Sequence, residues 1–179
     1  MKTVISLLIL VATSSAFAST LDLSKSSIHW SGSKITGDTH SGTLKIKSAN
    51  VDTTLGKINS GEVVVDMNTL DNTDLKGKWK TKFLTHMKSA DFLNLKKYPT
   101  ASLKVTKLNR GYMFGTLTIM GKSNPVSMAY TKKGKTYEGE LAFDRTLYNM
   151  KYGSGSFFKN LGDKTIDDTV ILKVKMVLK

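Results

Sequence analysis

The chain has 179 residues, no cysteine, 40% apolar residues and a formal net charge of +13. Its length fits a single domain, and the lack of cysteine excludes disulfides, iron–sulfur clusters, thiolate zinc sites and covalent haem attachment. The ordinary apolar content and only two prolines are typical of a globular protein and argue against a disordered linker.

The N-terminus has the pattern of a secretory signal peptide. Lys2 supplies the positive charge, residues 4–12 form a short apolar stretch, and Ala16-Phe17-Ala18 matches a cleavage site. A retained membrane helix is the alternative, but the apolar stretch is shorter than the roughly 20 residues that a bilayer span needs. We therefore expect removal of residues 1–18, a single domain over residues 19–179, and a periplasmic or secreted location.

Lysine dominates the charge, because only Arg110 and Arg145 among the 27 basic residues are arginines. Lysine has no planar fork, so this composition suits diffuse attraction to anionic surfaces better than bidentate recognition of phosphates or bases. Export would also separate the protein from intracellular nucleic acid, and we expect no nucleic-acid partner. The lysines predict a solubilising surface, with weak contact to an anionic membrane or envelope surface as a possible partner.

After the leader, apolar and polar residues alternate with a period of two, which is typical of half-buried strands. Successive runs have their apolar residues at 28–30, 44–46, 63–67, 101–105, 113–119, 126–130, 137–143 and 170–178. Gly37-Asp38, Asn109-Arg110-Gly111 and Lys132–Lys135 supply turn chemistry between strands. We predict a mainly β fold, an antiparallel barrel of eight or slightly more strands, since closure removes sheet edges. A two-sheet sandwich is the alternative.

One stretch breaks this period and predicts a short helical insertion around residues 75–95. Apolar residues recur there every four positions, as on one helical face: Leu75, Trp79, Phe83 and Met87. An oxygen-bearing side chain just upstream is expected to cap the helix, and the candidates are Asp71, Thr73 and Asp74.

Two short patterns imitate catalytic machinery. Gly121-Lys122-Ser123 resembles the end of a P-loop, but its upstream glycine is misplaced, and Pro125 with a strand pattern follows where a helix is required. We predict a hairpin turn instead. His86 lies close to Ser89 and Asp91, as in a triad, but local capping at the end of a helix explains these residues more simply.

The remaining titratable residues also point away from catalysis. His29, His40 and His86 lack the spacing of a helical zinc pair. Glu138 and Glu140 share the outward face of one strand, and Asp167-Asp168 is expected in a turn, so both pairs are interpreted as solvated charge. We predict no catalytic residue, no metal site and no cofactor.

The inward face of the predicted barrel is apolar and unusually rich in methionine. It includes Trp30, Met67, Met113, Met128 and Met176, and methionine adapts to irregular apolar neighbours. An eight-stranded barrel can be filled by its own side chains or can hold one ligand. Periodicity alone leaves a packed core and a cavity as alternatives.

Four segments together resemble a known family. They are His86-Met87 with Ser89–Pro99, Gly115–Gly121 with Pro125-Val126, Asp144-Arg145 with Tyr148–Gly153, and Trp30 with Gly37, His40 and Gly42. In this order they are similar to the motifs of the YceI-like family, polyisoprenoid-binding proteins with a lipocalin-like barrel. The resemblance implies an exported bacterial protein with a helical insertion and an elongated apolar pocket for isoprenoid or related lipid chains. Leu93, where the family commonly has phenylalanine, and the lysine excess depart from the family pattern.

Strand parity and this resemblance together predict the residues that line the pocket. They are Trp30, Val65, Phe83, Met87, Phe92, Leu103, Leu117, Ile119, Met128, Phe143 and Leu172. Tyr98, Asp144 and Arg145 are expected to hold loops at one end of the barrel, with contact to a ligand headgroup as the alternative role of Arg145.

The predicted function is therefore binding without catalysis. We expect an exported protein that sequesters or carries a polyisoprenoid, an isoprenoid quinone or a similar long apolar chain inside the barrel. One alternative is a cationic envelope protein with a packed barrel whose lysines bind anionic polymers or lipids. A lipid-modifying enzyme is a further alternative, but it would need a polar group among the predicted pocket residues, which are all apolar.

Overall fold

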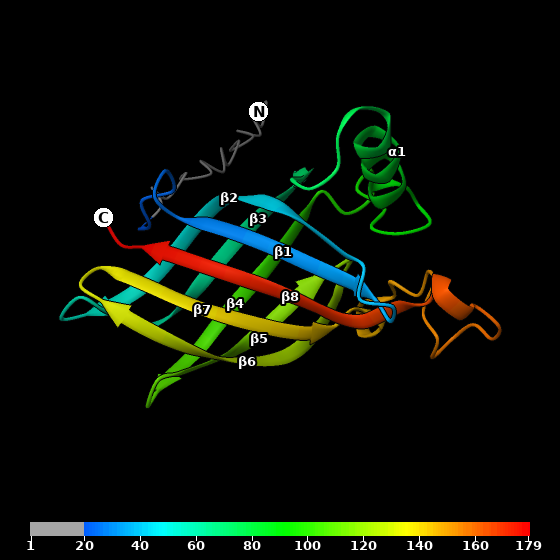
Figure 1. Ribbon diagram of the computed structural model, residues 1–179. Coiled ribbons are helices and arrows are strands. Elements are labelled where there is room, and N and C mark those ends of the chain that lie inside the picture. The colour runs from blue at the N-terminus through cyan, green and yellow to red at the C-terminus, as the bar shows by residue number, and fades with distance from the viewer. Residues whose placement is uncertain (1–19) are drawn as a thin grey trace, which may run out of the picture.

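The computed structural model describes residues 20–179, which form a closed antiparallel barrel (Figure 1). Its strands are β1 (Ser27–Lys34), β2 (Thr39–Thr54), β3 (Lys57–Asn72), β4 (Thr100–Asn109), β5 (Tyr112–Ile119), β6 (Lys122–Lys133), β7 (Thr136–Asp144) and β8 (Ile166–Val177). Each strand pairs with the next, and β8 pairs with β1. The predicted eight-stranded barrel is confirmed, and the sandwich alternative is wrong. The predicted signal peptide lies outside the described residues.

The connections between strands alternate between the two ends of the barrel. One end, called here the α1 end, carries the connections 35–38, 73–99, 120–121 and 145–165, including the helix α1 (Gly77–Lys88) and the short 3-10 helices η1 (Arg145–Tyr148) and η2 (Gly162–Lys164). The opposite end carries three tight hairpins and both termini of the described chain (Figure 1). None of the helices in residues 20–179 has the length and apolarity to span a membrane.

Two of the short turns between strands have the backbone geometry that their sequences predict. Arg110 and Gly111, between β4 and β5, have φ values of 48° and 83°, and Met120 and Gly121, between β5 and β6, have 50° and 72°. Two successive residues with positive φ form a type I′ turn, which matches the twist of paired strands. Gly121 therefore belongs to a hairpin turn, as predicted. The segment Gly121-Lys122-Ser123 is not a P-loop, because it leads into strand β6 and not into a helix.

The helical insertion is confirmed, but its expected apolar face is partly wrong. Phe83, Leu84 and Met87 pack against the barrel, whereas Trp79 is 60% exposed. On a helix with 3.6 residues per turn, four residues advance by about 400°, which is one full turn plus roughly 40°. Apolar residues spaced by four therefore rotate gradually around the helix and do not stay on one face. Trp79 therefore points away from the wall that Phe83 and Met87 contact.

The expected capping of α1 is also wrong. The residue at the N-cap is Lys76, and no side chain caps the helix there. Asp71 instead lies 2.8 Å from Lys80, and Asp74 binds residues at the start of β2. The two carboxylates therefore connect the helical insertion to the barrel. They do not cap the N-terminus of α1.

Irregularities in β2 explain why its full length was not predicted. The pairing of β2 with β3 shifts between Thr43 and Lys45 and again between Ile46 and Ser48. A one-residue shift sends later side chains to the opposite face. The inward positions therefore change from Leu44 to Ala49 and Val51, which interrupts the alternation in the sequence.

The end opposite α1 is closed by its own hydrophobic cluster. Leu21, Ala49, Val51, Val63, Tyr137 and Leu178 are buried together there. Leu21 also forms an isolated bridge with Leu178, and the Tyr137 hydroxyl accepts a hydrogen bond of 3.0 Å from the amide of Ile58. Apolar side chains therefore fill the barrel at the end opposite α1.

Candidate functional site

A cavity of about 400 Å³ occupies the interior of the barrel. Side chains from all eight strands and from α1 line it, and most of them are leucine, isoleucine, valine, methionine or phenylalanine. It extends from Val51 and Tyr137 near the closed end to Phe83 and Met87 below α1. The interior is therefore a long apolar cavity and not a fully packed core.

The structure places the predicted pocket residues on the wall of this cavity. These are Trp30, Val65, Phe83, Met87, Phe92, Leu103, Leu117, Ile119, Met128, Phe143 and Leu172. The strands and α1 bring them together because inward positions alternate along each strand and the helix covers one end. Their role in holding a ligand stays a prediction.

Several inward side chains keep accessible surface although they point to the middle of the barrel. Val65, Leu103, Met128, Phe143 and Leu172 are only half-buried, and all of them line the cavity. In a packed barrel such positions would be covered by one another. Their remaining exposure is consistent with an interior surface that an apolar molecule could cover.

An empty interior would be energetically costly. At roughly 24 cal/mol per Å³, a dry cavity of about 400 Å³ corresponds to about 10 kcal/mol of lost packing. The free energy of unfolding of a whole domain is typically about 5–15 kcal/mol. A ligand or solvent that occupies the cavity would offset this cost.

The wall at the α1 end depends on a close approach at Gly42. Trp30 donates a hydrogen bond of 3.1 Å from its indole nitrogen to the carbonyl oxygen of Asp71 and lies across this glycine. A Cβ atom at Gly42 would lie 1.8 Å from that oxygen and 2.7 Å from the Trp30 ring. The absence of a side chain at Gly42 therefore lets the indole form part of the cavity wall, where it stacks on Phe83 with ring centroids 6.0 Å apart.

Sequence analysis missed polar residues that line the same end of the cavity. His40 is one of them, and its Nδ1 lies 2.6 Å from an Asp74 carboxylate oxygen. The other Asp74 oxygen accepts hydrogen bonds from the Ser41 amide at 2.7 Å and from the buried Asn72 side chain at 2.8 Å. Burial by itself would raise the pKa of Asp74, but the hydrogen bonds from Ser41, His40 and Asn72 hold that pKa below its ordinary value.

His86 is the second polar residue at this end that sequence analysis did not assign to the pocket. It lines the cavity from α1, with its ring 5.9 Å from Phe92 and 4.4 Å from Tyr152. Its Nε2 is buried and has no hydrogen-bond partner within the described part of the chain. Leaving such an atom unpaired costs roughly 1–3 kcal/mol, so a group that pairs with it after the ring turns toward the cavity would stabilise the site.

Local contacts explain the apparent triad around His86. The Ser89 hydroxyl donates a hydrogen bond of 2.8 Å to the carbonyl oxygen of His86, and the amide of Asp91 donates one of 3.3 Å to the same hydroxyl. Neither contact involves the His86 ring. The predicted capping at the end of α1 is therefore confirmed.

Arg145 is buried beneath the connection between β7 and β8. Its guanidinium donates hydrogen bonds to four main-chain carbonyl oxygens, those of Met150, Tyr152, Ile166 and Asp167, and lies 3.2 Å from the Asp168 carboxylate. These contacts supply a structural role at the barrel end and leave little donor capacity for a headgroup. The expected turn at Asp167-Asp168 is wrong, because both residues lie at the start of β8, where Asp168 meets Arg145.

The other titratable groups are spread over the outside of the barrel. Glu138 and Glu140 are exposed on β7 and lie 4.0 Å from Lys175 and 3.9 Å from Lys173. Over residues 20–179, no three histidine, aspartate or glutamate side chains gather in a cluster that could hold a metal ion.

Comparisons with known proteins agree with this architecture. Residues 20–178 match the family model described as a YceI-like domain. BcnA from Burkholderia cenocepacia is 23% identical over 89% of this chain and 99% of its own, with a TM-score of 0.68. A polyisoprenoid-binding domain from Saccharophagus degradans, implicated in plant cell wall breakdown, is 15% identical over 89% of this chain and 97% of its own, with a TM-score of 0.63.

A YCEI protein from Campylobacter jejuni is more distant in shape. It is 21% identical over 76% of this chain and 84% of its own, with a TM-score of 0.51. At these identities, the likeness to all three structures shows the shared fold. No curated protein matches the chain.

Proposed function

The chain belongs to the YceI-like family, and on that premise we propose that it binds an isoprenoid-type lipid inside its barrel without changing it chemically. Membership of this family confirms the resemblance that the sequence motifs predicted. The observation that carries the proposal is the hollow apolar interior of about 400 Å³, closed at one end and lined by half-buried side chains. Polyisoprenoids, isoprenoid quinones and similar long chains share the apolar character that this wall requires.

Burial of the chain would supply the binding free energy. Each methylene removed from water contributes roughly 0.8 kcal/mol, so an isoprene unit of five carbons contributes roughly 4 kcal/mol before the ordering of ligand and protein is counted. The wall offers this burial continuously, from Met87 at the α1 end to Tyr137 at the closed end.

Mass spectrometry tests this proposal directly. An organic extract of the purified protein should contain a long-chain lipid at a ratio near one per protein, and the native mass of the complex should exceed the chain mass by the mass of that lipid. The complex should persist through a high-salt wash, since apolar burial is not screened by ions. A lipid-free, stable protein that also fails to take up added prenyl or acyl chains would refute the proposal.

We propose further that the protein acts after export. The pattern of Lys2 and the cleavage motif at residues 16–18 supports a leader that is removed, with the mature chain in the periplasm or outside the cell. An intact mass that begins at Ser19 in protein recovered from cells would support export.

A specific surface feature favours membrane contact as a second function. Trp79 is exposed on α1, and the Nζ atoms of Lys78 and Lys82 lie 5.6 Å and 6.0 Å from its ring centroid. Tryptophan prefers the membrane interface, and lysines beside it attract anionic headgroups. We propose that α1 contacts an anionic membrane weakly and so brings the α1 end of the cavity close to its lipid source.

A further inference from the structure

The two histidines that line the cavity lie at its α1 end. Besides the two histidines, the charged residues along its wall are Lys34, Asp38, Glu138, Arg145 and Asp167. Lys34, at the end of β1, lies 3.3 Å from Asp38 in the β1–β2 loop. Glu138 is exposed beside Lys175. The guanidinium of Arg145 already donates hydrogen bonds to main-chain carbonyl oxygens. Asp167 is exposed and accepts a hydrogen bond from the Thr169 amide. Among the charged and imidazole groups of the wall, His40 and His86 are therefore the best placed to contact a ligand.

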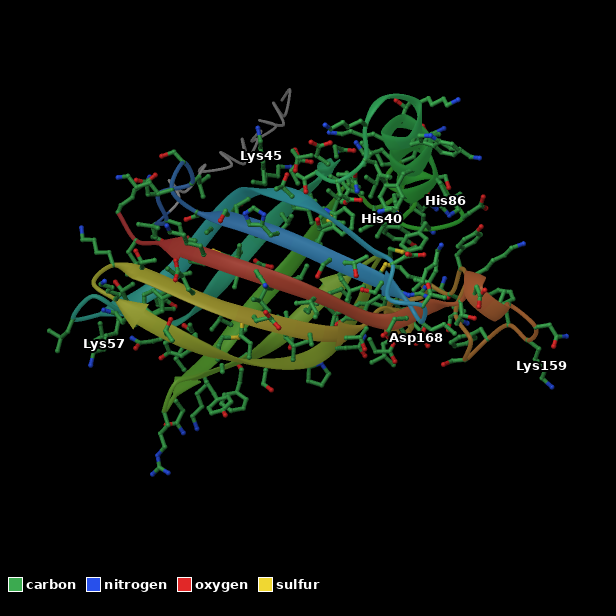
Figure 2. All side chains as sticks on the ribbon, viewed as in Figure 1. His40, Lys45, Lys57, His86, Lys159 and Asp168 are labelled. Carbon is green, nitrogen blue, oxygen red and sulfur yellow. The ribbon has the colours of Figure 1, made fainter. Side chains whose placement is uncertain are left out.

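The two histidines lie close to the same aromatic wall. Figure 2 shows both at the α1 end, His40 at the start of β2 and His86 on the helix. His40 packs on Phe83 with ring centroids 4.9 Å apart, and His86 packs on Phe92 at 5.9 Å. Each histidine therefore lies beside an aromatic ring that can contact the apolar chain of a lipid, and each has a ring nitrogen that can form a hydrogen bond with the lipid headgroup.

Asp74 restricts the hydrogen bonding of His40. The contact of its Nδ1 with the Asp74 carboxylate leaves Nε2 as the ring nitrogen that can face a ligand. Within residues 20–179 no carboxylate pairs with His86, and its buried Nε2 can be a donor or an acceptor according to the tautomer. The hydroxyl of an alcohol can donate to or accept from an imidazole nitrogen, whereas a hydrocarbon can do neither.

We propose that His40 and His86 form a headgroup site, so that the preferred ligand is a long-chain alcohol whose hydroxyl lies at the α1 end and whose chain runs toward the closed end. This inference rests on the proposed lipid binding. The carboxylate of Asp74 behind His40 and the occupied donors of Arg145 disfavour a phosphate or diphosphate head, which would require several free cationic donors. The site thus selects a neutral oxygen-bearing head.

Binding of three probes with the same isoprenoid chain tests the site: farnesol, the hydrocarbon farnesene and farnesyl diphosphate. Dissociation constants are measured by displacement of a fluorescent fatty-acid probe from the delipidated chain. The wild-type protein should bind farnesol about tenfold more tightly than farnesene, as expected for one or two hydrogen bonds. His86→Phe and His40→Phe should each reduce this ratio at least threefold, and the ratio cancels any change in affinity for the apolar chain that the two probes share.

Two further variants keep the test decisive. His29→Phe is the matched control, because His29 is exposed on β1 and does not line the cavity, so it should keep the wild-type ratio. His86→Gln retains a hydrogen-bonding side chain and should recover part of the preference if His86→Phe loses it. Circular dichroism melts identify any variant that has lost its fold.

The outcomes separate this inference from the proposed function. Equal wild-type affinity for farnesol and farnesene would overturn the headgroup site while leaving lipid binding intact. Tighter binding of farnesyl diphosphate than of farnesol would overturn the neutral head. Failure of all three chains to bind would refute the proposed function itself.

Discussion

At the scale of single residues, Leu117 offers the sharpest test of the cavity wall. Its side chain is buried on β5 and lines the interior, where a charge could reach water only through the space that the lipid would occupy. We expect Leu117→Lys to reduce the lipid that copurifies with the protein at least tenfold, measured by mass spectrometry per mole of folded chain. Leu103→Trp, which adds apolar volume at a half-buried wall position, should reduce the length of chain retained.

Lys133 supplies the control for these variants, because it is exposed at the end of β6. Lys133→Gln should keep the wild-type amount of lipid. Equal lipid retention in Leu117→Lys and Lys133→Gln, with both proteins folded, would show that the wall has been assigned incorrectly.

At the scale of elements, α1 is attached to the barrel partly through carboxylates. Lys80 lowers the pKa of Asp71, and the hydrogen bonds at Asp74 outweigh the effect of its burial and lower its pKa too. Groups with lowered pKa values stabilise the fold when ionised, so their contribution is complete above about pH 4 and is lost as the pH falls through the lowered values. We expect amide exchange in residues 77–88, corrected for intrinsic rates, to lose protection below pH 4 before β5 does.

Asp74→Asn tests the cause of this behaviour. The variant keeps the shape of the side chain but cannot ionise, so α1 should have lower protection at pH 7 and a flatter dependence on pH. Loss of protection in α1 and β5 at the same pH in the wild-type protein would contradict the expected local release.

At the scale of the whole molecule, charge and apolar burial should respond differently to salt. Removal of residues 1–18 takes away only Lys2, so the net charge falls from the +13 of the full chain to +12. The screening length shrinks from about 10 Å at 0.1 M salt to about 3 Å at 1 M, which weakens attraction to anionic vesicles but not burial in the cavity. We expect flotation with phosphatidylglycerol vesicles to fall several-fold over this range while the bound lipid stays constant.

Trp79→Ala should also reduce flotation, because it removes the exposed indole between Lys78 and Lys82. Phe114→Ala is the matched control, since Phe114 is an exposed aromatic residue on β5, away from α1. Equal flotation of the two variants would contradict docking through α1.

The sequence by itself determined the class of fold, the number of strands and the inward side of most of them. These features are local, because side chains alternate along a strand and a two-residue turn needs particular backbone angles. The same alternation identified Leu117 and Leu172 as inward residues without knowledge of their partners. It missed the long β2, since the register shifts around Lys45 and Ser48 depend on pairing with β3.

Only the tertiary structure decided whether the barrel is hollow and which polar residues line its α1 end. A cavity depends on the distance between opposite walls of the barrel. The alternation of side chains along one strand shows which of them point inward, but it gives no information about that distance. His40 and Asp74 are separated by 34 residues, and His86 comes from a helix whose placement depends on packing against the barrel. The exposure of Trp79 has the same origin, because the spacing of apolar residues defines a helical face but the barrel surface determines which part of that face is covered.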